Sequence, residues 1–418
     1  MRLERLEVVD FRNHDEAAVD LPAGVSVLVG PNGVGKTNLL EAIGYLATLG
    51  SHRVGQDASL VRAGAGSAVI RSAVRRAGRR LLVDLELRPG TGVRGRVNGA
   101  PVPRARDLLG VVRATMFAPE DLGLIRGDPE ERRRFLDTLA VQRLPRYHGS
   151  RQDYDRVLRQ RNSLLRSAGG RLLASALATL EVWDEKLASA GAEIWSERLR
   201  LVAALTPRVD LAYQRLAGRE DAVKVAYVSS VAGPGSPDPD PAKLAQALRE
   251  RLVADRAREV ERGLTLSGPH RDDLALTLRR LPARTHASHG EAWSLALALR
   301  LGSHRLLAEE GEEPVLLMDD VFAELDRQRR DRVAEAAVAA EQAIVTAAVA
   351  EELPPELHAA VFHVEPGSVQ LSKGPCTNHP IRALELQVGG PDRRRRVEGG
   401  GARRRGWSLT GAGRRGRG

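Results

Sequence analysis

Residues 30–37 read Gly-Pro-Asn-Gly-Val-Gly-Lys-Thr and directly follow the apolar run Val25–Val29. The stretch matches the GxxxxGK[ST] pattern of a phosphate-binding loop, in the strand-then-helix context that this chemistry requires. Its glycines let successive backbone N–H groups turn toward one anion. The sequence therefore predicts an α/β nucleotide-binding protein, and the whole loop is expected to line the phosphates: Gly30, Pro31, Asn32, Gly33, Val34, Gly35, Lys36 and Thr37.

Two side chains of this loop have separate roles in the predicted site. Lys36 is expected to reach the β- and γ-phosphates of ATP, and the Thr37 hydroxyl to bind Mg²⁺. The helix that opens at Asn38 would point its positive dipole end at the phosphates. A chance glycine-rich turn is the alternative, and the complete pattern between a strand and a helix disfavours it.

The second half of the predicted site lies far downstream. Residues 314–320 read Pro-Val-Leu-Leu-Met-Asp-Asp, a short apolar run that ends in two acids. Such a run is typical of a buried parallel strand that delivers carboxylates to the sheet edge. Asp319 is expected to hold Mg²⁺ through water, and Asp320 to orient and deprotonate the attacking water. An ordinary strand end with two solvated carboxylates is the alternative.

The distance between these halves, about 280 residues, indicates a split ATPase head with other structure inserted. Just ahead of the acidic strand, Ser288 and Gly290 open an amphipathic helix over residues 292–307. A serine and a glycine at a helix N-terminus form a second anion site. One nucleotide does not need two such loops from one chain. Two chains packed head to tail would each offer Ser288 to the γ-phosphate that the other holds.

Several stretches resemble known ATPases. Ser288-x-Gly290 resembles the signature motif of ABC-type ATPases, and residues 319–326 resemble their acidic strand and D-loop. The sequences of these and other motifs resemble the RecF family more closely still. The motifs occur in that family's order, over roughly residues 1–373. The stretches that carry this resemblance are Asp10–Asn13, Gly30–Ala42, Phe117–Leu122, Arg132–Asp137, Arg161–Asn162, Ser267–Asp273 and the Asp-Asp-Val-Phe run at 319–322.

The resemblance implies an α/β fold, a split ABC-type P-loop ATPase head with a mainly helical inserted arm. It also implies an ATP-dependent DNA-binding dimer with weak, DNA-dependent ATPase activity, catalysed by Asp320 and Lys36. Such a protein acts at single-strand gaps with RecR and RecO to help load RecA. By the same resemblance, Arg12 and Asn13 are expected at the nucleotide.

The chain departs from the family pattern at two positions. The signature glutamine is Glu291 here, which puts any contact that needs an amide donor in doubt. The switch histidine of transporter ATPases is absent after residues 343–346, where Thr346 ends the expected strand. A histidine-assisted hydrolysis route is therefore not expected, and turnover should be slow.

Composition favours a cytoplasmic protein. The single cysteine, Cys376, excludes a disulfide framework. No apolar run approaches the ~20 residues of a membrane span, and the N-terminus lacks the apolar region of a signal peptide. A transporter-type ATPase subunit docked on a membrane partner is the rival function. The missing histidine, the inserted helices and an arginine-rich sheet argue against it, and the short arm disfavours an SMC-like tether.

The net charge of +10 is concentrated in two segments. Residues 71–113 carry eleven arginines and three acids, and residues 391–418 carry ten arginines and two acids. Segregated positive charge is typical of a nucleic-acid footprint. Residues 67–97 alternate as an antiparallel sheet does, and four of its arginines are the DNA-contact candidates: Arg75, Arg76, Arg79 and Arg80. Solvated strand faces in an arginine-rich proteome are the alternative.

Four segments are expected along the chain. They are an N-terminal head part (1–120), a helical arm lobe (121–262), a C-terminal head part (263–373) and a disordered Gly/Arg-rich tail (374–418). In the arm, helices are predicted over 154–166, 172–205 and 241–263, and a strand over 222–230. Residues 267–273 are predicted to form a polar cluster between strands, without an assigned role. The tail is either a nucleic-acid-binding arm or the product of an altered reading frame.

Overall fold

The structure is a computed structural model that describes residues 1–169, 174–218, 220–233 and 237–372. The tail over 374–418, predicted to be disordered, lies outside the described residues. Residues Met1–Ser372 form one compact unit, so the boundaries expected within it stay a prediction.

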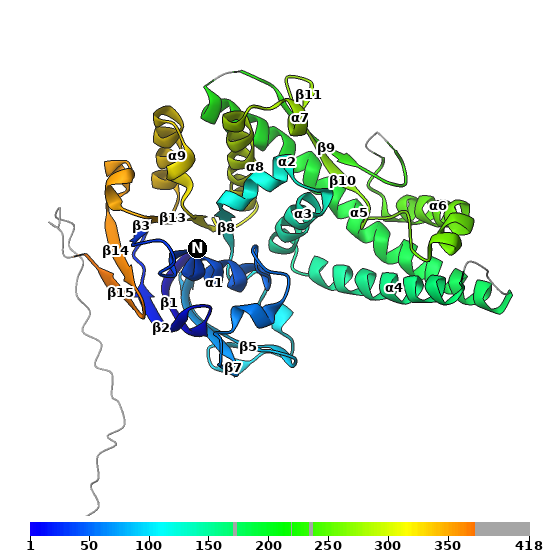
Figure 1. Cartoon of the computed structure of the whole chain (residues 1–418), viewed down its shortest axis with the longest axis horizontal. Coiled ribbons are helices and arrows are strands. Elements are labelled where there is room, and N and C mark those ends of the chain that lie inside the picture. The colour runs from blue at the N-terminus through cyan, green and yellow to red at the C-terminus, as the bar shows by residue number, and fades with distance from the viewer. Residues whose placement is uncertain (170–173, 219, 234–236, 373–418) are drawn as a thin grey trace, which may run out of the picture. The chain divides into compact units, whose positions relative to one another are not determined.

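A mixed six-stranded sheet forms the centre of this unit (Figure 1). Its strands, in sheet order, are β15 (Ser368–Leu371), β14 (Ala360–Glu365), β3 (Gly24–Val29), β13 (Gln342–Ala347), β12 (Val315–Met318) and β8 (Ala114–Phe117). All neighbours pair in parallel except β14 and β15. The carboxyl ends of β3, β13, β12 and β8 therefore meet at one edge, which positions the site described below.

Alternation along the central strands divides the core in two. On β3, Val25 and Val27 face one cluster of buried side chains, and Leu28 faces the other. On β12, Leu316 faces the first of these clusters and Leu317 faces the second. Both faces of the sheet are covered, which is why these strands read as continuous apolar runs.

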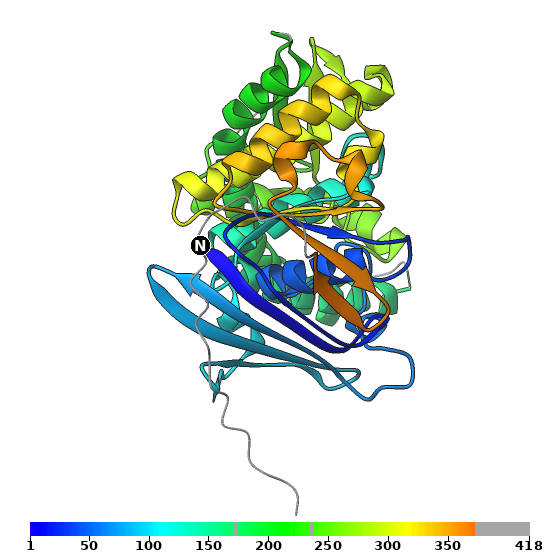
Figure 2. The ribbon, with the colours of Figure 1, turned by 90° about the vertical axis from the view of Figure 1, so that its left-hand side faces the viewer.

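A six-stranded antiparallel sheet covers one side, and helix α1 (Lys36–Thr48) packs between the two sheets (Figure 2). The antiparallel strands, in sheet order, are β2 (His14–Asp20), β1 (Arg2–Phe11), β4 (Ala68–Arg76), β5 (Arg79–Arg88), β6 (Gly92–Val97) and β7 (Ala100–Pro101). The antiparallel sheet predicted for residues 67–97 is confirmed.

Helices and a small sheet cover the other side. The helices are α2 (Leu122–Arg126), α3 (Pro129–Arg143), α4 (Tyr147–Ser167), α5 (Ala174–Ala217), α6 (Pro241–Arg262), α7 (Ala283–His286), α8 (His289–Glu309) and α9 (Arg327–Ala339). The sheet joins β11 (Leu281–Pro282), β10 (Asp273–Leu278) and β9 (Val223–Val228). Single-turn 3₁₀ helices lie at Asp57–Leu60, Ala105–Leu108, Pro119–Asp121, Val321–Glu324, Ala350–Glu352 and Pro355–Leu357.

Two of the predicted arm helices were too short. Helix α4 begins at Tyr147, seven residues before the predicted start, because this buried tyrosine extends the apolar face. Helix α5 has 44 residues and runs through Pro207. It continues because Val209 and Tyr213 are buried, and a Cβ on Gly302 of α8 would lie 2.9 Å from the Val209 side chain. Tertiary packing of the stripe outweighs the proline.

The motif at residues 267–273 is a buried joint between α6 and β10, not a cluster between strands. Arg198 of α5 donates two hydrogen bonds to the Asp137 carboxylate, at 2.9 and 3.0 Å, and one to the Pro269 carbonyl at 2.7 Å. The Tyr154 hydroxyl lies 2.6 Å from His270 Nδ1. Burial lowers the pKa of His270 to about 4, so the ring is neutral and accepts this bond. The motif thus ties the arm helices to the small sheet.

A second buried arginine fastens the arm helices to one another. Arg161 of α4 is 0% exposed. Its guanidinium donates to Asp184 at 2.7 Å, to Glu259 at 2.7 Å and to the Thr265 hydroxyl at 2.8 Å. The arginine therefore connects α4, α5 and α6 through charge-assisted bonds.

We predict that Arg161→Met lowers the unfolding free energy by about 3–5 kcal/mol, because the buried Glu259 loses its cation and Asp184 keeps only Arg256. The matched control is Arg156→Ala on the same helix. Arg156 pairs with Asp153, but both side chains are more than 60% exposed, so the change should stay below about 1 kcal/mol. Denaturant unfolding measures both variants. Equal losses of unfolding free energy would contradict the role of Arg161 in connecting the arm helices.

Candidate nucleotide site

The loop at residues 30–37 is shaped by close backbone approaches. A Cβ on Gly35, where φ is 114°, would lie 2.3 Å from His14 Nε2. A Cβ on Gly30 would lie 2.5 Å from the Val364 carbonyl oxygen. At both positions glycine is required because an added Cβ would clash with a neighbouring residue, as well as because of the backbone conformation. Pro31, Asn32 and Gly33 are exposed at the tip of the loop.

Lys36 lies along the inside of the loop. The residue is 4% exposed, and its ammonium donates to the Gly30 carbonyl at 2.7 Å and to the Pro31 carbonyl at 3.2 Å. These bonds place the cation where the loop curls. A bound phosphate would then meet a cation that is already positioned.

The two halves of the predicted site meet through one hydrogen bond. The Thr37 hydroxyl donates to Asp319 Oδ1 at 2.9 Å, across 282 residues of sequence. Asp319 is 3% exposed, and burial raises the pKa of its carboxyl group, with Asp320 and Glu120 acting in the same direction. The same oxygen accepts a hydrogen bond from Thr346 at 2.7 Å. Among the described residues, Asp319 Oδ2 accepts no hydrogen bond.

Asp320 follows in an uncommon backbone conformation. Its φ is 46° and its ψ is 29°, in the left-handed region. The Asp320 N–H donates to the Thr346 hydroxyl oxygen at 2.9 Å. The carboxylate is therefore presented at the sheet edge beside Asp319, as expected from the sequence.

Asn13 and Arg12, both expected at the nucleotide, lie in the turn between β1 and β2. The Asn13 amide donates to the carbonyls of Gly33 and Val34, at 3.3 and 3.0 Å, and so contacts the loop directly. The Arg12 guanidinium instead donates two hydrogen bonds to the carboxylate of the buried Glu41 of α1, at 2.6 and 2.7 Å. A direct contact of Arg12 with nucleotide stays a prediction.

Two buried residues near the loop, His14 and Glu41, were not predicted from the sequence: His14 contacts the loop, and Glu41 holds Arg12. His14 is 1% exposed, and its Nε2 lies 3.1 Å from the Gly35 carbonyl. Burial lowers the pKa of His14, so its ring is neutral and Nε2–H donates. Burial alone would raise the pKa of Glu41, yet hydrogen bonds from Arg12 and Ser51 keep it below the ordinary value. Glu41 could have been noticed in the sequence, because it is an acid within the apolar stretch that follows Thr37.

Ser288 and Gly290 open α8, as predicted, and Ser288 is exposed. Glu291, the departure from the family glutamine, completes a capping box. Its carboxylate accepts the Ser288 N–H at 2.9 Å, and its own N–H donates to the Ser288 hydroxyl at 3.3 Å. Arg279 pairs with this carboxylate at 2.8 Å. Gly290 lies beside Arg329 of α9, whose Nη1 would be 3.0 Å from an added Cβ.

The four arginines predicted to contact DNA are not equally available. Arg75 and Arg80 both pair with Glu4, at 2.5 and 3.2 Å. Arg76 pairs with Glu312 at 2.6 Å. Arg79 is exposed and has no ion-pair partner among the described residues. Three of the four charges are therefore partly neutralised within the chain.

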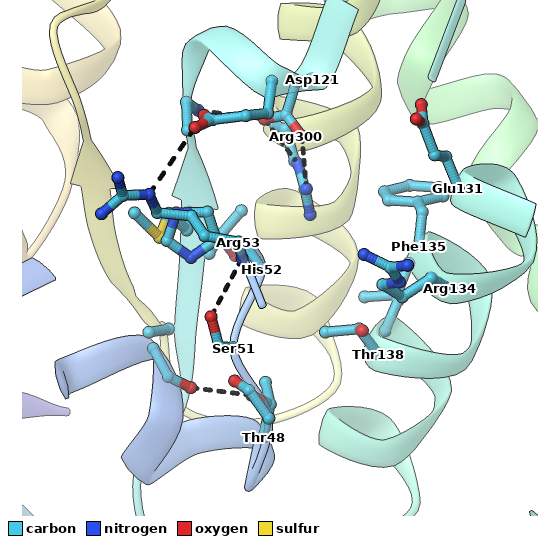
Figure 3. Close-up of a pocket in the computed structure, with 18 of the residues that line it drawn as sticks. Thr48, Ser51, His52, Arg53, Asp121, Glu131, Arg134, Phe135, Thr138 and Arg300 are labelled. Atoms are coloured by element: carbon cyan, nitrogen blue, oxygen red, sulfur yellow. Dashed lines mark hydrogen bonds and ion pairs between the residues drawn. The ribbon is translucent and has the colours of Figure 1, made fainter. Parts of the chain in front are cut away.

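A cavity of about 810 Å³ lies beside the C-terminal half of α1 (Figure 3). Ser51, His52 and Arg53 line one side, and α3 lines the other. Arg300 of α8 and Asp121 form a bidentate pair in it, at 2.5 and 3.0 Å. Residues 30–37 do not line this cavity. The candidate site is therefore assigned from the loop and the acids, not from this cavity.

Sequence comparison identifies the family. The model of the RecF/RecN/SMC N terminal domain family matches residues 2–355. The protein named DNA replication and repair protein RecF from Frankia alni is 55% identical over 375 residues, covering 88% of this chain and 99% of the relative. Its namesake from Streptomyces avermitilis is 52% identical over 380 residues, covering 88% and 100%. The chain belongs to the RecF family.

Solved structures agree with this assignment. A structure described as the recombination mediator protein RecF-ATP in the RecFOR pathway superposes with a TM-score of 0.80 at 27% identity, covering 88% of this chain and 97% of the other. An Smc head domain from Pyrococcus yayanosii has a TM-score of 0.50 at 14% identity, covering 88% and 96%, and shows the fold alone. The predicted fold, an ABC-type ATPase head of the RecF and SMC kind, is confirmed. The chain is thus an ATPase-family protein of DNA replication and repair.

Two further features bear on the site. None of the described helices combines the length and apolarity needed to cross a bilayer. Within the described residues, no group of three or more His, Cys, Asp or Glu side chains could hold a metal on its own. In proteins Mg²⁺ is commonly bound by one or two carboxylates together with substrate phosphates and water.

We predict that Gly35→Ala lowers ATP affinity at least tenfold and the unfolding free energy by about 2–4 kcal/mol, because the added methyl meets His14. Gly33→Ala is the matched control. Gly33 also has a positive φ, 86°, but nothing lies within 4 Å of an added Cβ, so only about 1 kcal/mol should be lost. Nucleotide titration and thermal unfolding measure both. Equal losses would mean that conformation, not the His14 contact, sets the requirement.

Proposed function

We propose that this chain is an ATP-switched, DNA-binding dimer that works with RecR and RecO in the cytoplasm to help load RecA at single-strand gaps. The observation that carries the proposal is the 2.9 Å bond between Thr37 and Asp319, which joins the phosphate loop to the acidic strand. The solved RecF-ATP structure, described as a recombination mediator of the RecFOR pathway, and the curated relatives in replication and repair support it.

The residues at the sheet edge fit ATP with Mg²⁺. Thr37 and Asp319 offer a hydroxyl and a carboxylate oxygen side by side, the donor types that Mg²⁺ prefers. The metal would neutralise charge between the β- and γ-phosphates. Lys36 would exchange its two loop carbonyls for phosphate oxygens. Asp320 would accept the proton of the attacking water.

The dimer follows from two exposed half-sites. The tip of the phosphate loop is exposed, and so is Ser288 at the start of α8. A helix N-terminus favours an anion, and the signature loop of one chain would complete the γ-phosphate site of its partner. Glu291 adds negative charge there, which Arg279 offsets.

For DNA, we propose the arginine-bearing end of the β4–β5 hairpin, with the exposed Arg79 as its most available cation. Arg75, Arg76 and Arg80 would contribute once their acidic partners are displaced. Because phosphate contacts release counterions, binding should depend on salt. Residues 374–418 would add to it through charge alone.

We predict that Asp320→Asn binds ATP and accumulates as a dimer, because the base is lost while Thr37 and Asp319 remain. Light scattering with ATP and Mg²⁺ over time measures the dimer fraction, which should decay at least tenfold more slowly than in the wild type. Lys36→Met is the control and should stay monomeric. Wild-type cleavage by Asp320→Asn would remove it from the role of base.

We predict that Arg79→Ala lowers the slope of log affinity for duplex DNA against log salt by about 0.9, because one phosphate contact is lost. Arg75→Ala is the matched control on the same sheet, and it should change the slope less because Glu4 already neutralises that charge. Both are measured by salt titration with ATP. A larger effect at Arg75 would show that the ion pairs open on DNA binding.

A further inference from the structure

The end of β13 places a threonine between the two acids of the site. Thr346 is 0% exposed. It stands where the sequence lacks a switch histidine, and the proposed mechanism gives it no role. Its hydroxyl oxygen lies 2.7 Å from Asp319 Oδ1 and 2.9 Å from the Asp320 backbone nitrogen.

The chemistry of a hydroxyl fixes the direction of both bonds. A hydroxyl has one proton to donate and lone pairs to accept. The Asp320 N–H can only donate, so the Thr346 oxygen accepts there. Its proton then points to Asp319 Oδ1 at 2.7 Å, which is closer than Asp320 Oδ1 at 3.5 Å. One side chain thereby satisfies the backbone of one acid and the carboxylate of the other.

The backbone bond acts where the chain is strained. A left-handed conformation costs a residue other than glycine roughly 1–2 kcal/mol, although aspartate tolerates it better than most. Asp320 adopts this conformation with φ 46° just before the turn Val321–Glu324. The N–H bond to Thr346 holds the residue in that well. Without it, the Asp320 carboxylate could relax away from the sheet edge.

The carboxylate bond matters most when nucleotide binds. Asp319 Oδ1 accepts from both Thr37, at 2.9 Å, and Thr346. Thr37 is the residue expected to turn toward Mg²⁺, and it would then leave Asp319. Thr346 has no such second task and would keep the carboxylate oriented.

We propose that Thr346 is a positioning residue for ATP cleavage: its hydroxyl fixes Asp320 in the left-handed conformation and orients Asp319. The inference rests on the proposed role of Asp320 as base. In this proposal, the buried hydroxyl of Thr346 aligns the site by holding the two acids, Asp319 and Asp320, in place. Unlike a histidine that reaches the phosphate, Thr346 acts without touching the nucleotide.

The test compares Thr346→Val, Thr346→Ala and Thr346→Ser in the full-length chain. Valine keeps the shape and removes the hydroxyl, alanine removes both, and serine restores the hydroxyl. The matched control is Thr115→Val on β8. Thr115 is 4% exposed, and its hydroxyl has no hydrogen-bond partner among the described residues. Thermal unfolding, equilibrium ATP affinity, single-turnover cleavage and the lifetime of the ATP-induced dimer are measured for each variant.

Valine and alanine at 346 should lower single-turnover cleavage at least tenfold, keep ATP affinity within about threefold and lengthen the dimer lifetime. Serine and the Thr115 control should behave as the wild type does. A loss of ATP affinity equal to the loss of cleavage, or a serine variant as slow as valine, would reduce Thr346 to a packing role. Normal cleavage by Thr346→Val while Asp320→Asn is inactive would overturn this inference alone. Normal cleavage by Asp320→Asn would overturn the proposed base and this inference with it.

Discussion

The hydrogen bond from Thr37 to Asp319 is the contact on which the site depends. It closes a loop of 282 residues, and it can form only because β3, β13 and β12 run parallel in one sheet. Their register brings Val29, Ala347 and Met318 to the same edge. The buried alternation of both faces stabilises that register, since a slip of one residue would exchange the two cores.

Local signals were enough to predict the parts of the site that are continuous in sequence. The loop at 30–37, the acids at 319 and 320 and the capping serine at 288 each sit at the end of a recognisable element. The antiparallel sheet was predictable for the same reason, since its residues alternate with period two. In these segments local pattern and tertiary environment agree.

What could not be predicted depends on partners distant in sequence. The pairing of Arg75 with Glu4 joins strands β4 and β1, and no spacing rule reveals it. His14 became visible as the support of Gly35 only when the β1–β2 turn met the loop. The extension of α5 past Pro207 likewise depends on packing against α8. The motif at 267–273 gave no role from sequence because its partner, Arg198, lies far away on α5.

In the proposed dimer, ATP is shared between the phosphate loop of one chain and the signature loop of another. This sharing is tested most directly by mixing Lys36→Met chains with Ser288→Arg chains. The first variant keeps a signature loop but cannot bind ATP, and the second binds ATP but cannot complete a partner's site. We expect the mixture to form ATP-dependent dimers and to cleave ATP, while neither variant does so alone. An inactive mixture beside an active wild type, or ATP-dependent dimers of Ser288→Arg alone, would contradict it.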